Sequence, residues 1–297
     1  MLASISYPPI PIFELGPLRL SLHGLMAGVG FVVGATLMVR EARRRGFDEE
    51  KIMSVLSWAL IASLLGARYF TVPAHLDEGW VEALKPFGTF SIMGGFAGGI
   101  IVGGWRMRRL GIDVAAHMDM ASFGLAIGTV VGRVGDMFIV EHLGSPTSLF
   151  FGYAVKPGYD LAPQHNGLEC GASEAVDGIC GVYHHVAMYD MFGAAVLLGL
   201  LYLVARRWSQ IRYGVLVFVW AAWYGLQRFL LDSLRNTGFA EGADATAGPF
   251  TWNQWTGLVA GVLAMVAVGW IALRKVTPVV SREEDVARGA VSPVAVG

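Results

Sequence analysis

Seven apolar runs divide this chain, and they constrain its fold more than any other feature of the sequence. Each run is close to the roughly 20 residues that an α-helix needs to cross the hydrocarbon core of a bilayer. The third and fourth runs are rich in glycine, which spanning helices tolerate at close helix contacts. The sequence therefore predicts an all-α integral membrane protein with seven transmembrane helices, near residues 21–39, 52–72, 88–105, 114–135, 186–205, 213–232 and 253–273.

The composition agrees with lipid as the solvent for most of the chain. Hydrophobic residues make up 55% of the 297 residues and charged residues 15%. A soluble domain carries about 25% charged residues. The formal net charge is −1 and no basic tract is present, so nucleic acid is not an expected partner.

Basic residues concentrate on one side of the predicted spans. The segments after the first, third, fifth and seventh runs hold fifteen of the 22 lysine and arginine residues. The positive-inside rule then places the N-terminus outside and the C-terminus in the cytoplasm, and an odd number of spans requires the same. We expect one seven-helix domain over residues 1–275, with an outer head at 138–185 and a disordered cytoplasmic tail at 276–297.

Both cysteines, Cys170 and Cys180, fall in the predicted outer head, between the fourth and fifth spans. An oxidising exterior favours a disulfide between them. A zinc site shared with His184 and His185 is the alternative. Nothing else in the chain supplies the spacing of metal ligands, so no metal is expected.

Three arginines, Arg68, Arg133 and Arg228, lie inside or at the edge of predicted spans. At about 1.5 Å per residue, they stand roughly 24–30 Å from the cytoplasmic ends of their helices. Because the hydrocarbon core is about 30 Å thick, this depth is in the outer leaflet near the headgroups. Further polar residues reach the same level, namely His23, Asp136, His184, Tyr189, Asp190, Asp232 and Arg235.

Two interpretations of this polar layer are open. The arginines can extend to lipid phosphates and pair with neighbouring acids, which would only hold the helices together. Alternatively, several guanidinium groups at one depth form a bidentate site for the phosphate of a lipid headgroup. The number of polar residues at one level on different helices favours the phosphate site.

The stretch GRVGDMFIVEHLGSPT, residues 132–147, resembles a signature of the bacterial prolipoprotein diacylglyceryl transferase family, G-R-x-G-N-x-x-x-x-E-x-x-G-x-P-T. Weaker resemblances cover most of the chain. LGARYF, with Arg68, is similar to a G-A-R element, and HHVAMYD, with His184 and Tyr189, to H-P-x-x-x-Y-E. YGLQRFLLDSLR is similar to Y-x-x-x-R-F-x-x-E-x-x-R and contains Arg228, Asp232 and Arg235.

The resemblance implies a specific reaction. An enzyme of this family moves the diacylglyceryl group of phosphatidylglycerol onto the lipobox cysteine thiol of a prolipoprotein and releases glycerol phosphate. The family works at the outer face of the bacterial cytoplasmic membrane, has seven spans with the N-terminus outside, and needs no metal or organic cofactor. We expect a monomer, with membrane phospholipid and the precursor as its partners. Our hypothesis for the head at 138–185 is that it docks the precursor or gates lipid entry.

This reaction assigns roles within the polar layer. A thiolate attacks a glyceryl carbon and a phosphate departs, so arginines fixed beside the growing charge stabilise the transition state. Arg133 and Arg228 are assigned this role, and Arg68 and Arg235 are the second candidates. The resemblance adds Glu141 as a catalytic candidate and Gly144, Asp232, His184 and Tyr189 as candidates for substrate binding.

Four positions depart from the family pattern. A family histidine is Met93, the asparagine after G-R-x-G is Asp136, an asparagine three residues later is Ile139, and a tyrosine is His23. Methionine cannot accept the proton of a thiol whose pKa is about 8.5. His23 is the candidate base, His142 is the alternative, and Asp136 is also a catalytic candidate. The other interpretation is a catalytically altered paralogue that binds phospholipid or uses a different acceptor.

Two further classes of seven-helix protein agree less well with the sequence. A retinal protein needs a lysine deep in its last span, and residues 253–273 contain none. A transporter should show internal repeats with charges near the bilayer midplane. No repeat is apparent here, and the charges lie near the outer surface.

Overall fold

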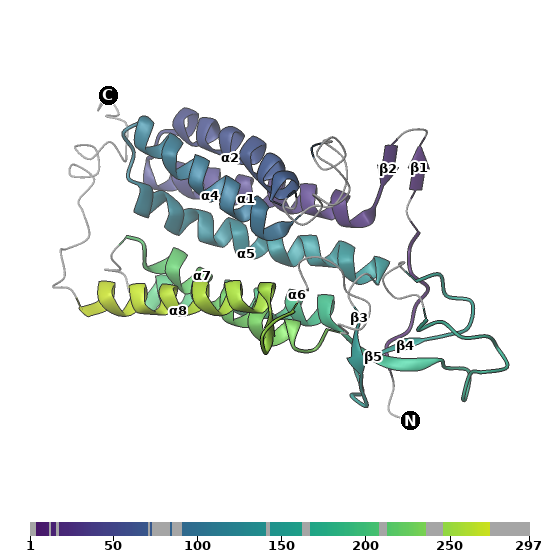
Figure 1. The fold of residues 1–297 in the computed structure, drawn as a ribbon. Helices are drawn as coiled ribbons and strands as arrows, with labels where there is room; N and C mark the ends of the chain where they lie inside the picture. Colours follow the sequence, from purple (N-terminus) through teal and green to yellow (C-terminus); the bar gives the residue numbers. More distant parts are fainter. Residues whose placement is uncertain are drawn as a thin grey trace. The chain divides into compact units, whose positions relative to one another are not determined.

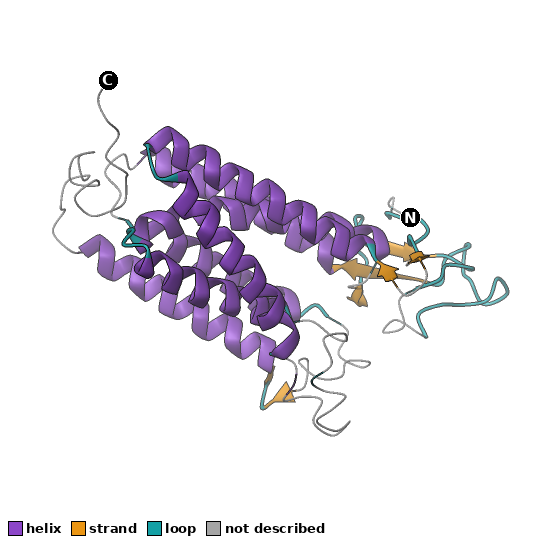
Figure 2. Cartoon of the chain, turned by 90° about the horizontal axis from the view of Figure 1, so that it is seen from above, coloured by secondary structure: helices purple, strands orange, loops and turns teal. Residues whose placement is uncertain are grey.

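The computed structural model describes residues 4–11, 13–15, 18–70, 72, 84, 91–140, 143–161, 167–207, 213–235 and 246–273. Over these ranges the chain is mostly helical, with short strands near some helix ends (Figure 2). The helices are α1 (Leu22–Arg45), α2 (Glu49–Tyr69), α4 (Ile92–Arg109), α5 (Val114–Ile139), α6 (Val186–Arg207), α7 (Val215–Asp232) and α8 (Trp252–Leu273) (Figure 1). Each apolar run of the sequence corresponds to one of these helices.

Six of these helices are long and apolar enough to cross a membrane. The exception is α4, which has 18 residues and carries Arg106, Arg108 and Arg109 in its last turn. The helical fold class is therefore confirmed, together with six candidate spans. The predicted third span also begins later than expected, because Ser91 caps the helix by accepting a hydrogen bond from the Gly94 amide at 3.3 Å.

The chain forms two compact units. The first unit consists of residues 1–34, 122–209 and 218–274, and the second of residues 35–121, 210–217 and 275–297. α1, α5 and α7 each contribute one part to the first unit and another part to the second.

Glycine pairs bring neighbouring helices into direct backbone contact. In the second unit, a Cβ on Gly98 of α4 would lie 2.3 Å from the Ala62 carbonyl oxygen of α2, and a Cβ on Gly94 would lie 2.4 Å from the Gly66 oxygen. Figure 1 shows α2 and α4 running side by side. Small residues permit such approaches between membrane helices, where packing replaces the hydrophobic effect as the main attraction.

The first unit repeats this arrangement twice. α1 and α5 meet where a Cβ on Gly30 would lie 2.6 Å from the Gly128 oxygen. α7 and α8 meet where a Cβ on Gly225 would lie 2.5 Å from the Gly257 oxygen. Several glycines of the apolar runs are therefore contact points between helices.

The second unit has an apolar core near the connection of α1 to α2 and that of α4 to α5. Its buried side chains include Met38, Phe47, Ile52, Met107 and Met120. Asp48 begins α2 by accepting hydrogen bonds from the Glu50 and Lys51 amides. Buried Asp119 accepts hydrogen bonds from the amides of Gly214 and Val217 at 2.8 and 2.9 Å, so a carboxylate from α5 caps the start of α7.

A three-stranded antiparallel sheet forms the centre of the head, in the order β3 (Leu143–Pro146), β5 (Gly181–His185), β4 (Tyr153–Val155) (Figure 1). The amino-terminal arm adds to β4, because the Ile5 amide donates to the Gly152 oxygen at 3.0 Å and the Ala154 amide donates to the Ile5 oxygen at 2.8 Å. Two hairpins complete the strands, β1 (Phe13–Leu15) with β2 (Leu18–Leu20) and β6 (Thr246–Ala247) with β7 (Phe250–Thr251).

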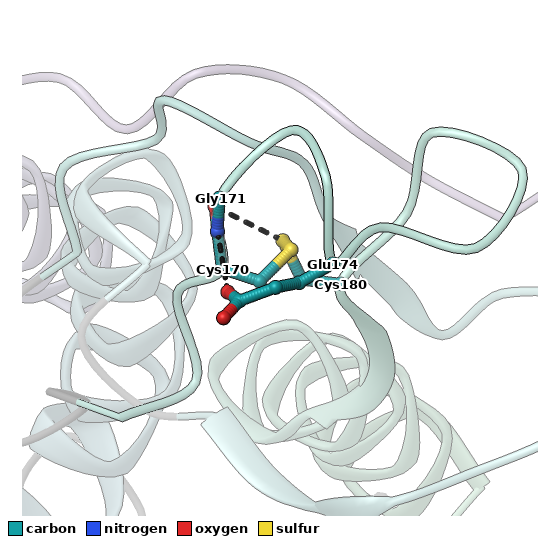
Figure 3. Close-up of a disulfide and its surroundings, with 4 residues drawn as sticks. All are labelled: Cys170, Gly171, Glu174 and Cys180. Carbon is teal, nitrogen blue, oxygen red and sulfur yellow. Dashed lines mark hydrogen bonds between the residues drawn. A yellow bond between two sulfur atoms is a disulfide. The ribbon is translucent and has the colours of Figure 1, made fainter.

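A disulfide joins Cys170 and Cys180 in the loop that leads into β5 (Figure 3). The same loop is closed by the Gly171 amide, which donates to the Glu174 carboxylate at 2.8 Å. The predicted head at 138–185 overlaps this region, although α5 extends to Ile139 and residues 141–142 and 162–166 lie outside the described part. The predicted tail at 276–297 also lies outside the described residues.

The contact between α2 and α4 predicts different effects on stability for glycine-to-alanine substitutions at two positions of α4. Gly98→Ala should lower the free energy of unfolding by about 1–3 kcal/mol, because its Cβ would overlap the Ala62 carbonyl oxygen. Gly104→Ala should be neutral or raise it by up to about 1 kcal/mol, because nothing lies within 4 Å of a Cβ there and alanine favours helix. Thermal melting in detergent measures both variants, and equal midpoints would contradict the packing described.

Candidate functional site

A buried arginine of α5 holds two carboxylates from different parts of the chain. The Arg133 Nη1 group donates to Asp136 Oδ2, one turn further along α5. Its Nη2 group forms an ion pair with Asp190 Oδ2 of α6 at 2.6 Å. All three residues are at most 6% exposed. Buried charges are tolerated when they are paired in this way, and the pairing ties α5 to α6.

Asp136 also binds a histidine of α1. Its Oδ1 atom contacts His23 Nδ1, so the carboxylate lies between an imidazole and a guanidinium. The contact depends on Gly135, where a Cβ would lie 2.6 Å from the Leu22 oxygen and 3.0 Å from the His23 Cα. The side chain of His23 is 49% exposed, whereas that of Asp136 is 2% exposed. We call Arg133, Asp136, Asp190 and His23 the Arg133 network.

A second set of charges lies at the end of α7. Arg228 Nη2 and Arg235 Nε each lie 3.3 Å from Asp232 Oδ1. Arg228 and Asp232 are buried, and Arg235 is partly exposed. We call these three residues the Arg228 network. Buried Tyr224, one turn before Arg228, interacts electrostatically with members of both networks.

The two networks share one end of the first unit. Arg133 and Asp136 lie in the last two turns of α5, and Arg228 and Asp232 lie in the last two turns of α7. His23 and Asp190 lie in the first two turns of α1 and α6. These helix ends lead to or from the strands of the head and of the amino-terminal hairpin. Six residues of the expected polar layer therefore lie near helix ends of the first unit.

The substrate-binding candidates of the head lie beside these helix ends. Gly144 of β3 packs under the segment after α7, where a Cβ would lie 2.3 Å from the Leu234 oxygen and 3.0 Å from the His184 Cβ. The Ser145 amide donates to the same Leu234 oxygen at 2.8 Å. His184 Nδ1 lies 3.1 Å from the Tyr189 hydroxyl, which brings the last strand residues and the first turn of α6 together.

A sequence profile of the prolipoprotein diacylglyceryl transferase family matches residues 11–270. The chain belongs to this family. A phosphatidylglycerol–prolipoprotein diacylglyceryl transferase of Frankia alni is 30% identical, over 97% of this chain and 73% of the relative. One of Frankia casuarinae is 29% identical, over 97% of this chain and 67% of the relative. One of Gloeobacter violaceus is 25% identical, over 89% of this chain and 93% of the relative.

The family motif at residues 132–147 thus contributes to the contacts of the site. Arg133 and Asp136 form its ion pairs, Gly135 contacts α1 and Gly144 contacts the segment after α7. Glu141, which matches the glutamate of the family motif, and His142 lie outside the described residues. Gly135 and Gly144 of the motif have no room for a Cβ, because atoms of other elements lie 2.6 and 2.3 Å from its position.

Not every candidate lies in the first unit. Arg68, which matches the family's G-A-R element, is a buried residue of α2 in the second unit. Met93, at the position of the family histidine, is on α4 in the same unit. Cys170 and Cys180 are joined to each other in the head, and the described residues contain no group of three metal-ligating side chains.

Two contacts beside Arg133 do not follow from the sequence. Asp190 is a member of the expected polar layer, but its pairing with Arg133 spans 57 residues of chain and does not follow from the sequence. Gln227 is not among the sequence-based candidates, although it lies in an apolar helix directly before Arg228. Its amide binds the Asp190 carboxylate at 2.6 Å. An uncharged amide inside an apolar run was the signal that could have indicated it.

The amino-terminal arm is held against the site by aromatic and histidine side chains. The Tyr7 hydroxyl donates to the Met137 carbonyl oxygen at 2.5 Å and lies 2.8 Å from His185 Nε2. The Tyr153 hydroxyl donates to the Tyr7 carbonyl oxygen at 2.5 Å. Burial raises the pKa of both tyrosine hydroxyls and lowers the pKa of His185 to about 4. His185 is therefore neutral near pH 7.

The lowered pKa of His185 predicts a loss of stability in acid. An unfolded histidine has a pKa of about 6.5, so the unfolded chain binds the extra proton first as the pH falls. The contribution of His185 is complete above about pH 6.5 and is lost towards pH 4, by about 3 kcal/mol in total. Thermal midpoints of the wild type and His185→Gln between pH 7 and 4.5 measure it. The wild type should fall more steeply, and parallel curves would contradict the assignment.

Proposed function

We propose that this protein moves the diacylglyceryl group of phosphatidylglycerol onto the lipobox cysteine thiol of a prolipoprotein and releases glycerol phosphate. Membership of the transferase family and the names of the curated relatives support the reaction. The observation that carries the proposal is the Arg133 network with the Arg228 network, which holds three arginines at one end of the first unit. The reaction needs no metal or organic cofactor.

The enzyme acts at the outer face of the bacterial cytoplasmic membrane as a monomer. In this arrangement all seven helices cross the bilayer, with the N-terminus outside and the C-terminus in the cytoplasm. The three arginines that end α4 support it, because they then lie on the cytoplasmic side, where positive residues are favoured. The site then lies at the level of the outer headgroups, and the head at 138–185 docks the precursor.

The arginines act on the leaving phosphate. The precursor sulfur bonds to the glyceryl carbon, the bond from that carbon to the phosphate ester oxygen breaks, and its electron pair leaves with the phosphate. Negative charge therefore grows on the phosphate in the transition state, and preorganised guanidinium groups of Arg133 and Arg228 stabilise it. Arg235 and Asp232 keep Arg228 in place, and Arg68 is a second candidate for lipid binding.

His23 is the base that accepts the thiol proton. Its Nδ1 atom is held by Asp136, and its half-exposed ring is the most accessible part of the Arg133 network. An imidazole in contact with a carboxylate keeps a fixed orientation and is stabilised when it becomes charged. Protonation of His23 also adds positive charge to the site at the moment when charge grows on the phosphate. The departing phosphate can then take up the same proton.

Substitution of Arg133 tests the phosphate assignment. Arg133→Lys should lower kcat about 100-fold, because lysine cannot hold both Asp136 and Asp190 in a fixed fork. Transfer from phosphatidylglycerol to a lipobox peptide in proteoliposomes measures this. The control is Arg106→Lys, an arginine that binds Ser54 in the second unit and should stay within about twofold of the wild type. Full activity of Arg133→Lys would refute the assignment.

Removal of His23 tests the base. His23→Ala should lower kcat about 100-fold or more at pH 7, and the residual rate should rise with pH towards the thiol pKa of about 8.5. Met93→His in the wild-type background restores the family's histidine position. Complementation of cells depleted of their own transferase gives a second readout. A wild type that fails there while Met93→His succeeds would identify a catalytically altered paralogue, and an unchanged pH profile of His23→Ala would exclude His23 as the base.

A further inference from the structure

An amide on α7 continues the Arg133 network on the side away from His23. Gln227 Nε2 donates to Asp190 Oδ1 at 2.6 Å and to the Asp190 carbonyl oxygen at 3.1 Å. Asp190 Oδ2 is the atom that pairs with Arg133 at 2.6 Å. The two oxygens of one buried carboxylate are therefore held by different helices, α7 and α5.

The orientation of the Gln227 amide follows from its other neighbour. Trp223 Nε1 lies 2.6 Å from Gln227 Oε1, and an indole N–H can only donate. The oxygen of the amide must therefore point to Trp223 and its nitrogen to Asp190. Trp223 also lines an apolar groove of about 270 Å³ with residues of α6 and α8, so no polar side chain of that groove competes for the indole.

The chain makes room for this amide at one position of α6. A Cβ on Gly193 would lie 2.1 Å from Gln227 Oε1, so any larger residue there would displace the amide. The hydrogen bonds then form an ordered series from Trp223 through Gln227 and Asp190 to Arg133. A carboxylate with both oxygens engaged has no freedom to turn away from the guanidinium.

We propose that Gln227 is a positioning residue, which holds the Asp190 carboxylate in the rotamer that aims Arg133 at the leaving phosphate. This inference rests on the proposed transferase function. Gln227 touches no reacting atom, and its effect reaches the phosphate only through Asp190 and Arg133. An aspartate is shorter than the glutamate of the family motif, and the Gln227 amide supplies a second anchor for this shorter side chain.

A purely structural role would also be satisfied by any amide–carboxylate pair between α6 and α7. Asp190→Asn combined with Gln227→Glu exchanges the two groups and leaves the net charge unchanged. The pair between the helices can still form, but Arg133 then faces a neutral amide, whose hydrogen bond is weaker than that of a carboxylate. The exchange therefore separates helix attachment from the aiming of Arg133.

The experiment compares the wild type with Gln227→Leu, Asp190→Asn and the exchange variant, each as full-length protein in phosphatidylglycerol proteoliposomes with a lipobox peptide. The exchange variant should recover most of the thermal midpoint that Asp190→Asn loses, yet keep a kcat about 100-fold below the wild type with KM within about twofold. Gln227→Leu should lower kcat about tenfold. Recovery of kcat together with the midpoint in the exchange variant would overturn the inference.

A matched control is available on α8. Gln254 is a buried glutamine, which accepts from the Thr251 amide at 2.9 Å and donates to Ser233 Oγ at 3.0 Å. Gln254→Leu should lower the thermal midpoint and leave kcat within about twofold of the wild type. Gln227→Leu behaving in the same way would also overturn the inference. A wild type without any transfer would refute the proposed function itself, and the positioning role with it.

Discussion

The ion pairs of Arg133 are the interaction on which the described site depends. A guanidinium buried in a membrane helix costs several kcal/mol unless carboxylates and hydrogen bonds replace its hydration. Here two carboxylates do so, Asp136 from the same helix and Asp190 from α6. These two acids also connect the arginine to its neighbours, because His23 binds one of them and Gln227 binds the other.

The balance of charge in the site bears directly on the proposed chemistry. The two networks contain three arginines and three aspartates, so their formal charge is zero while His23 is neutral. An arginine cluster without acids would hold a phospholipid strongly in its ground state, which does not by itself increase the rate. A paired cluster that becomes positive only when His23 takes up a proton favours the more charged leaving phosphate over the starting diester.

The two departures from the family pattern at residues 23 and 136 are explained by one contact. Asparagine and tyrosine at these positions would be neutral, whereas Asp136 carries a carboxylate that contacts both Arg133 and His23. Together they form the pair between Asp136 and His23, supported by the close approach of α1 and α5 at Gly135. The two departures are therefore in direct contact, and the base proposed above is one member of this pair.

Hydropathy alone determined where the helices lie, because a run of about 20 apolar residues has few other stable states in a bilayer. Counting residues along each helix also placed Arg133, Arg228, Asp232 and His23 at one level, since helix rise is constant. Which of these side chains touch was decided only by the tertiary structure. Arg133 and Asp190 are 57 residues apart in sequence, His23 and Asp136 are 113 apart, and Arg68, at a similar expected depth, belongs to the other unit. The depth of a residue follows from the geometry of one helix. The contacts of its side chain depend on how neighbouring helices rotate and pack. Glycines such as Gly135 set the distance between two helices, but the sequence does not say which helix is the partner.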